Sequence, residues 1–551
     1  MIRFRHWPTA IALTATMALA GALPAVAQDK VLTVAQPGDS GLDNLDPRIN
    51  ISTNNQFVQI AIFDPLVRSR GSDFEPAAAE SWEVSPDGMT YTFHLRDAKW
   101  SDGKPVVAGD FVSAFQRLFV SSGFSQIYDI ILNGAEVREG KKGAEELGVA
   151  APDDHTLVIT LNGPAPYFLG LASSALAAPS RADLVEANGD SYGADVGTFA
   201  TNGPFLLDTW EHENEIVLKK NPDYWNADAI KLDEVHILVL PDTGTQRNMF
   251  DNGELDLYGI SVPLTDEELA TYGAEGKLQT YNRGGYRGIT FNQFGQNDPE
   301  KAKILSNPDF RKAISYALDR TTFVEKVMGG NGMPATVQTP PGHTVYPGKS
   351  WGEVSPNIGK FHPVTPDLAK SKEYMDKALA ATGFASVADL PEFELLTNED
   401  PQNPKMVTPY VLSVLTQQLG LKVKLKQVTG PEFWNVFLEP SLGFDMVVTG
   451  WGPDFDDPFT YMGYWVSSSK DMGATFDNAD YDAILARANA ETDLVKRAAI
   501  LGEAEALFSD IGPSVPFVFY KGVVAVQPEV KDLLFSVFGV NVNYVYADIE
   551  Q

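Results

Sequence analysis

The stretch FDMVVTGWGPDFDDPFTYMGYW, residues 444–465, joins a strand pattern to a loop of unusual composition. The apolar run at its start is typical of a buried β-strand. The loop that follows places three carboxylates, Asp454, Asp456 and Asp457, among Trp, Phe and Tyr side chains. A metal site, a catalytic pair and a grip on a cationic ligand are three chemistries that would place acids in such surroundings.

Strand and helix patterns alternate on both sides of this stretch. Residues 91–95 alternate apolar and polar side chains, as a half-buried strand does. Residues 243–253 follow a buried strand and predict a helix that ends at a glycine. Residues 307–318 predict a further helix, with Asn307 or Asp309 as its N-cap. This repeated strand-helix-strand order indicates the α/β class.

The first 27 residues have the pattern of a secretory signal peptide. Arg3 and Arg5 precede an uncharged apolar run, and Ala-Val-Ala at 25–27 is a small-residue motif that predicts cleavage before Gln28. No later segment approaches ~20 uninterrupted apolar residues, so no membrane span is expected. Because the chain has no Cys, it offers no thiol for a lipid anchor, and we expect a periplasmic protein.

Length and charge restrict the remaining classes. Removal of 27 residues from 551 leaves 524, which is more than one hydrophobic core usually serves, so at least two lobes are expected. The net charge of −31 disfavours binding to nucleic acid or to anionic lipid.

Catalytic and metal motifs are missing from the sequence. It lacks G-x-S-x-G, H-E-x-x-H and a P-loop, and its seven His residues are scattered singly. Asp454 and Asp456 match the first two ligand positions of an EF-hand loop, but Pro458 and Trp465 stand where later ligands are required. We therefore expect no metal, no cofactor and no catalytic residue. A secreted hydrolase with paired acids stays open as an alternative of another class.

With metal and catalytic roles disfavoured, binding of a cationic ligand remains as the function of Asp454. An ionised carboxylate among aromatic residues is costly to desolvate unless a cation meets it, and the amine of a ligand can be that cation. Capping of the following turn is the competing explanation, and we favour it for Asp456 and Asp457.

Ordered motifs along nearly the whole mature chain carry a resemblance to a known family. They include LDPRI, IFDPLV, PAAAESWEVSPDGMTYTFHLRDAKWSDGKPV, TNGPFLLDTW, NPDYW, NPDFRKAISYALDR, GMPATVQTPPG and GWGPDFDDP. In these motifs the chain resembles solute-binding protein family 5, the periplasmic oligopeptide- and dipeptide-binding proteins of peptide ABC importers.

The resemblance implies a bilobal periplasmic-binding-protein fold with an extra inserted domain and a ligand cleft between the lobes. Lobe I is expected to be discontinuous, with the inserted domain inside it, and to include residues 28–64, 200–285 and 518–551. The inserted domain is expected at 65–199, and lobe II at 286–517.

The ligand site is also implied by the resemblance. The family motif G-W-x-x-D coincides with residues 450–454. In the family its Asp grips the α-amino group of the ligand, while the flanking backbone pairs with the peptide as an added β-strand. The expected ligand-binding residues are therefore Gly450, Trp451, Gly452 and Asp454.

Recognition of the ligand carboxylate departs from the family pattern. The oligopeptide-binding member uses basic side chains at three positions, which correspond here to Met328, Asn403 and Val448. A remaining cation could come from Arg283, Arg287 or Lys405, although such residues are more often solvated.

These observations together predict a monomeric, non-enzymatic receptor in the periplasm. It would capture peptides and deliver them to an inner-membrane ABC permease. The loss of the three cations keeps a second ligand class open, a non-standard amine such as a murein peptide, an opine or an amino-acid conjugate.

Overall fold

The structure is a computed structural model. It describes residues 29–550 except 37–41, 51, 71–72, 122–124, 261–263, 399–406, 439–442, 468 and 470–474. The predicted signal peptide, residues 1–27, lies outside the described residues.

One large mixed sheet joins distant parts of the described chain. Its strands in spatial order are β17 (Val423–Val428), β16 (Phe393–Asn398), β18 (Met446–Trp451), β12 (Leu278–Phe291), β19 (Ser514–Val526), β11 (Leu257–Tyr258), β1 (Val31–Ala35), β10 (Glu234–Leu238), β9 (Glu215–Lys220) and β8 (Phe205–Glu211). A further strand, β13 (Gly332–Pro334), pairs with β19 outside this path.

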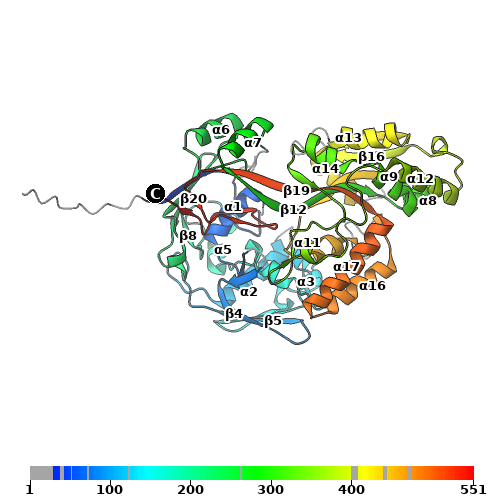
Figure 1. Ribbon diagram of the computed structural model, residues 1–551. Coiled ribbons are helices and arrows are strands. Elements are labelled where there is room, and N and C mark those ends of the chain that lie inside the picture. The colour runs from blue at the N-terminus through cyan, green and yellow to red at the C-terminus, as the bar shows by residue number, and fades with distance from the viewer. Residues whose placement is uncertain are drawn as a thin grey trace, which may run out of the picture.

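The two long strands β12 and β19 connect the halves of this sheet. They pair with each other in antiparallel fashion, and Figure 1 shows them crossing from the part that holds α6 and α7 to the part that holds α9 and α12. Their register shifts between Asn282 and Tyr286, where the ladder is interrupted. Because each strand serves both halves, this interruption lies at the connection between them.

In the first half of the sheet the described residues form three α-helices. They are α1 (Thr53–Ile62), α6 (Thr243–Asp251) and α7 (Asp266–Ala274). The Asp242 carboxylate accepts from the Thr245 N–H at 2.7 Å and caps α6. The chain leaves this helix at Gly253, whose φ of 77° suits glycine, so the predicted helix end is confirmed.

The second half is richer in helices. They are α8 (Pro299–Leu305), α9 (Pro308–Ala317), α10 (Arg320–Thr322), α11 (Trp351–Val354), α12 (Leu368–Thr382), α13 (Val407–Ser413), α14 (Gly430–Leu438), α15 (Phe459–Met462), α16 (Ala479–Ala490) and α17 (Leu494–Ile511). Asn307 is the N-cap of α9, as one of the two predicted candidates, and accepts from the Asp309 and Phe310 N–H groups.

A smaller antiparallel sheet forms a separate unit below the large one in Figure 1. Its strands in order are β4 (Ala79–Val84), β5 (Thr90–Leu95), β7 (Thr156–Thr160) and β6 (Val149–Asp153), and the helices of this segment are α2 (Ala108–Ser121), α3 (Gly134–Arg138), α4 (Phe168–Ala172) and α5 (Ala182–Asn188). The alternation predicted at 91–95 is confirmed, because Tyr91, Phe93 and Leu95 are buried. Tyr167 stacks on Phe455, with ring centroids 4.5 Å apart, so the acidic loop touches this unit.

Short two-stranded pairs complete the described strands. They are β2 (Val67–Arg70) with β3 (Asp73–Pro76), β14 (Thr344–Tyr346) with β15 (Lys349–Ser350), β20 (Val530–Lys531) with β23 (Asp548–Ile549), and β21 (Leu534–Phe535) with β22 (Val542–Asn543). The predicted α/β class is confirmed. The residue boundaries of the two lobes and of the inserted domain stay a prediction.

Candidate functional site

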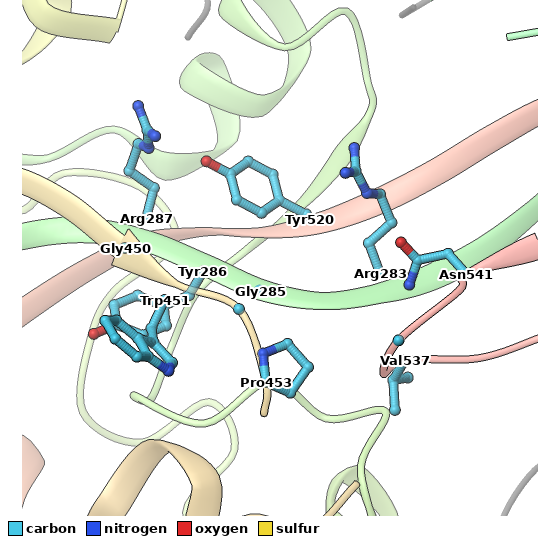
Figure 2. Close-up of a pocket in the computed structure, with 12 residues that line it drawn as sticks. Arg283, Gly285, Tyr286, Arg287, Gly450, Trp451, Pro453, Tyr520, Val537 and Asn541 are labelled. Carbon is cyan, nitrogen blue, oxygen red and sulfur yellow. The ribbon is translucent and has the colours of Figure 1, made fainter. Parts of the chain in front are cut away.

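A cavity of about 310 Å³ lies where β12, β18 and β19 meet the segment 537–541. Its lining residues are Arg283, Gly285, Tyr286, Arg287, Gly450, Trp451, Gly452, Pro453, Tyr520, Val537, Gly539 and Asn541. Figure 2 shows Arg283, Arg287 and Tyr520 on one side of the strands, and Trp451, Pro453 and Val537 on the other. Three of the four predicted ligand-binding residues, at 450–452, therefore line one cavity.

Glycines keep the backbone of this cavity accessible. Gly450 lies opposite Arg287 in the β12–β18 ladder, and a Cβ on Gly450 would lie 1.8 Å from the Tyr286 carbonyl oxygen. Gly452 follows the end of β18, is exposed, and has open space where a Cβ would be. Backbone that no side chain covers is what an extended ligand needs in order to pair with a strand.

Asp454 follows the lining residue Pro453 but does not itself line the cavity. The carboxylate accepts from Trp451 Nε1 at 3.3 Å, and the Asp454 N–H donates to Thr460 Oγ1 at 3.0 Å. The residue is half-buried. These bonds hold the carboxylate beside the backbone of 450–452, where it could meet an amine at the end of a bound ligand.

Asp456 does not cap the turn, so that prediction is wrong. Its carboxylate accepts from the Thr344 N–H at 3.0 Å and from Thr344 Oγ1 at 2.5 Å, and lies 3.1 Å from His343 Nδ1. Asp456 and His343 are both buried. This acid therefore ties the Pro-rich segment around 343 to the acidic loop.

The same contacts continue to the interrupted part of β12. His343 Nε2 lies 2.9 Å from the Tyr461 hydroxyl, which donates to the Gly284 carbonyl at 3.2 Å. Burial, the neighbouring Tyr286 and the carboxylates of Asp456 and Asp454 raise the pKa of Tyr461 well above its ordinary value. The phenol therefore keeps its proton and acts as a donor.

Asp457 has a different partner again. Its carboxylate accepts from Arg497 Nη1 at 2.7 Å and from Arg497 Nη2 at 2.9 Å, and both side chains are buried. It also accepts from the Phe459 N–H at 2.8 Å, so the predicted capping contact exists. The ion pair with Arg497 was missed, because no local spacing connects the two residues.

The structure also places the residues considered for carboxylate recognition. Met328 and Val448 belong to one apolar cluster of the second half, together with Ile289 and Tyr520. Arg283 is exposed, whereas Arg287 is half-buried, and both line the cavity. Asn403 and Lys405 lie outside the described residues.

The described ranges contain neither a metal-binding cluster nor a membrane-spanning helix. No group of three or more His, Cys, Asp or Glu in them could hold a metal ion. No helix among those the structure describes is long and apolar enough to cross a membrane.

A model of the bacterial extracellular solute-binding proteins, family 5 middle, matches residues 73–473. The chain belongs to this family. As a family 5 solute-binding protein it is an extracytoplasmic binding protein of the ABC importer system and not an enzyme, which excludes the secreted hydrolase.

Known relatives of this solute-binding protein match it over most of its length. The dipeptide-binding protein DppE of Bacillus subtilis is 30% identical over 92% of this chain and 90% of its own. The periplasmic oligopeptide-binding protein OppA of Salmonella typhimurium is 30% identical over 97% and 96%. Haemophilus influenzae OppA, in its crystal structure in complex with RPPGFSPFR, is 26% identical in sequence. The match covers 95% of this chain and 99% of that chain, with a TM-score of 0.72.

Not every relative is named for a peptide ligand. YgiS of Escherichia coli, 28% identical over 88% of each chain, is named a probable deoxycholate-binding periplasmic protein. Membership of family 5 therefore leaves the ligand to be argued from the site.

Proposed function

We propose that this protein captures a peptide or a peptide-like ligand between its lobes and delivers it, as a periplasmic monomer, to an inner-membrane ABC permease. The observation that carries the proposal is the cavity at the end of β18, where the backbone of 450–452 is uncovered and Asp454 is held beside it. Backbone pairing recognises any extended peptide, whereas the carboxylate recognises the amino group.

In this proposal the residues of the site have complementary tasks. Gly450 and Gly452 bring the backbone close to the ligand, because neither carries a side chain. Trp451 donates to Asp454 and fixes the direction of the carboxylate. An ammonium group that meets this carboxylate in a closed cleft is desolvated together with it, so the contact is strong only while both charges are present.

Calorimetry with one cognate ligand tests the task of Asp454. Asp454→Asn keeps the size of the side chain but removes its charge, and we expect it to cost about 2 to 5 kcal/mol of binding, roughly thirty-fold to several-thousand-fold in affinity. N-acetylation of the ligand should cause a similar loss, and the two changes together should be less than additive because they break one contact.

Asp477→Asn is the matched control for this experiment. Asp477 is an exposed acid of the same half of the molecule and does not line the cavity. The Asp477→Asn variant should therefore bind the ligand with the affinity of the parent. An Asp454→Asn variant that is folded and binds as well as the parent would place the amine elsewhere.

A second ligand class is favoured by one specific observation. The positions that carry cations in the oligopeptide-binding member are apolar here at Met328 and Val448. A murein peptide, an opine or an amino-acid conjugate could place its acidic groups differently from a standard oligopeptide. Native mass spectrometry of protein purified from its own periplasm separates the classes, since a mixture of peptide masses supports oligopeptides and one uniform mass supports a single conjugate.

A further inference from the structure

We propose that Arg287 binds the carboxylate of the ligand and selects short zwitterionic peptides, of about two or three residues, or amino-acid conjugates of that size. This inference rests on the proposed function, because it assumes that the amino group of the ligand lies at Asp454. Arg287 is then the partner of the opposite, carboxylate end of the same ligand.

The first observation is that the guanidinium of Arg287 has buried atoms without partners. Nε and Nη1 are shielded from solvent, and no described residue forms a hydrogen bond with either of them. Other buried arginines of the described chain have partners. Arg311 and Arg320 donate to backbone carbonyls. Arg48 and Arg497 each have one unpartnered nitrogen as well, but both are paired with a carboxylate, that of Asp46 or Asp457. Arg287 is half-buried, and a partly buried cation without a counter-charge is unfavourable, so its retention in a ligand cavity points to an anion that arrives with the ligand.

The second observation is where strand register places this side chain. Arg287 lies opposite Gly450, and Ile289 lies opposite Val448. Side chains two residues apart on one strand, and those directly opposite on the next, share a face of the sheet. Arg287 therefore projects from the same face as Val448 and is one cross-strand pair nearer to the acidic loop.

The third observation is that glycines leave the route between the two charges open. Arg287 and Pro453 lie on opposite sides of the strands in Figure 2 but line the same cavity, and so do Gly450 and Gly285, which carry no side chain. Residues 450–454 span at most about 14 Å when extended, and a chain of two or three residues spans about 7 to 11 Å. Since the Arg287 side chain reaches beyond its own backbone, a short ligand can join its guanidinium to Asp454.

The size of the cavity agrees with a short ligand. Its volume of about 310 Å³ is at the lower end of the range of ligand sites. A guanidinium can receive both carboxylate oxygens in parallel, which gives the contact direction as well as strength.

Arg487 provides a matched control outside the cavity. It is exposed, pairs with Glu503 at 3.0 Å and does not line the cavity. Its charge is solvated without any ligand, so its loss should leave binding unchanged.

The test is calorimetry with dialanine to pentaalanine, each as the free acid and as the C-terminal amide. We expect the parent protein to bind the di- or tripeptide acid most tightly and to prefer it over its amide by roughly 10- to 150-fold. In Arg287→Gln this preference should fall to within about threefold, while sensitivity to N-acetylation stays. Arg287→Lys should keep part of the preference, and Arg487→Gln all of it.

Thermal melting of the ligand-free variants gives a readout that a merely structural role would not produce. Because Arg287→Gln removes a half-buried charge that has no partner, the ligand-free variant should melt at the same temperature as the parent or higher. A lower melting temperature, or an unchanged preference for the acid in Arg287→Gln, would overturn the assignment.

If tetra- or pentaalanine binds most tightly, the proposed ligand length of two or three residues is wrong. If no peptide in the series binds the parent protein, the proposed function itself fails, whereas binding that depends on Asp454 but not on Arg287 rejects this inference alone.

Discussion

Three acids within four positions of one loop have three unrelated environments. Asp454 is half-buried beside the cavity, Asp456 is bonded to Thr344, and Asp457 is paired with Arg497. Residue type is therefore a poor guide to function in this loop. The partner of each carboxylate decides whether its loss should affect binding or folding.

At this scale, Asp457→Asn should destabilise the protein far more than a turn cap would. It leaves the buried guanidinium of Arg497 without a counter-charge, which we expect to cost about 3 to 5 kcal/mol of the free energy of unfolding. Urea unfolding followed by circular dichroism measures the change. The control is Glu503→Gln, which breaks the exposed 3.0 Å pair with Arg487 and should cost less than about 1 kcal/mol. Equal costs for the two variants would contradict this account.

Asp256 should make stability depend on pH. Burial raises the pKa of Asp256 to about 6 from an ordinary value of 3.8, against a hydrogen bond from the Thr33 N–H that lowers it. The folded protein thus holds this proton more tightly than the unfolded chain, so the group favours folding at low pH and loses this contribution as the pH rises from about 4 to 6. Asp256→Asn should raise the free energy of unfolding at pH 7.5 by roughly 1 to 3 kcal/mol, and much less at pH 4. Thermal melts at both pH values check this, and an equal gain at both would refute it.

At the scale of elements, the β12–β18 ladder depends on the absence of a side chain at one position. Gly450 faces the Tyr286 carbonyl so closely that any Cβ would force the strands apart. The same glycine exposes the backbone on which ligand pairing depends. One requirement of packing and one of function are therefore met by a single residue.

Gly450→Ala should lower the free energy of unfolding by about 1 to 3 kcal/mol or more, because the strand must move to admit the methyl group. Gly452→Ala is the matched control, since its Cβ would enter open space and should change stability by less than about 0.5 kcal/mol. Urea unfolding of both variants measures the difference. A Gly450→Ala variant as stable as the parent would mean that the strands are not held this closely.

At the scale of the whole molecule, β12 and β19 connect two halves across an interrupted ladder. Gly284, with φ of 67°, lies within the register shift, and its carbonyl accepts from Tyr461. A hinge usually consists of a few residues with irregular backbone between two rigid bodies. The ligand cavity lies beside this point, so a small rotation here would change its width.

Binding should therefore close the molecule. Small-angle X-ray scattering with a saturating ligand should show a smaller radius of gyration than without it, because both halves are needed to surround the ligand. Asp454→Asn should show the same compaction only at higher ligand concentration. Saturation by calorimetry with an unchanged radius of gyration would count against hinge closure.

Local patterns of the sequence determined the α/β class, the strand at 91–95, the Asn307 cap of α9 and the acidic loop after β18. Each of these depends on residues within one strand or one helical turn, where periodicity and capping act. Family motifs added the expected site at 450–454. Only the tertiary structure decided that Asp457 pairs with Arg497, that Asp456 meets His343, and that Arg287 lies unpaired opposite Gly450. These relations join residues far apart in the chain, and no local pattern encodes a partner that only folding brings within hydrogen-bond distance.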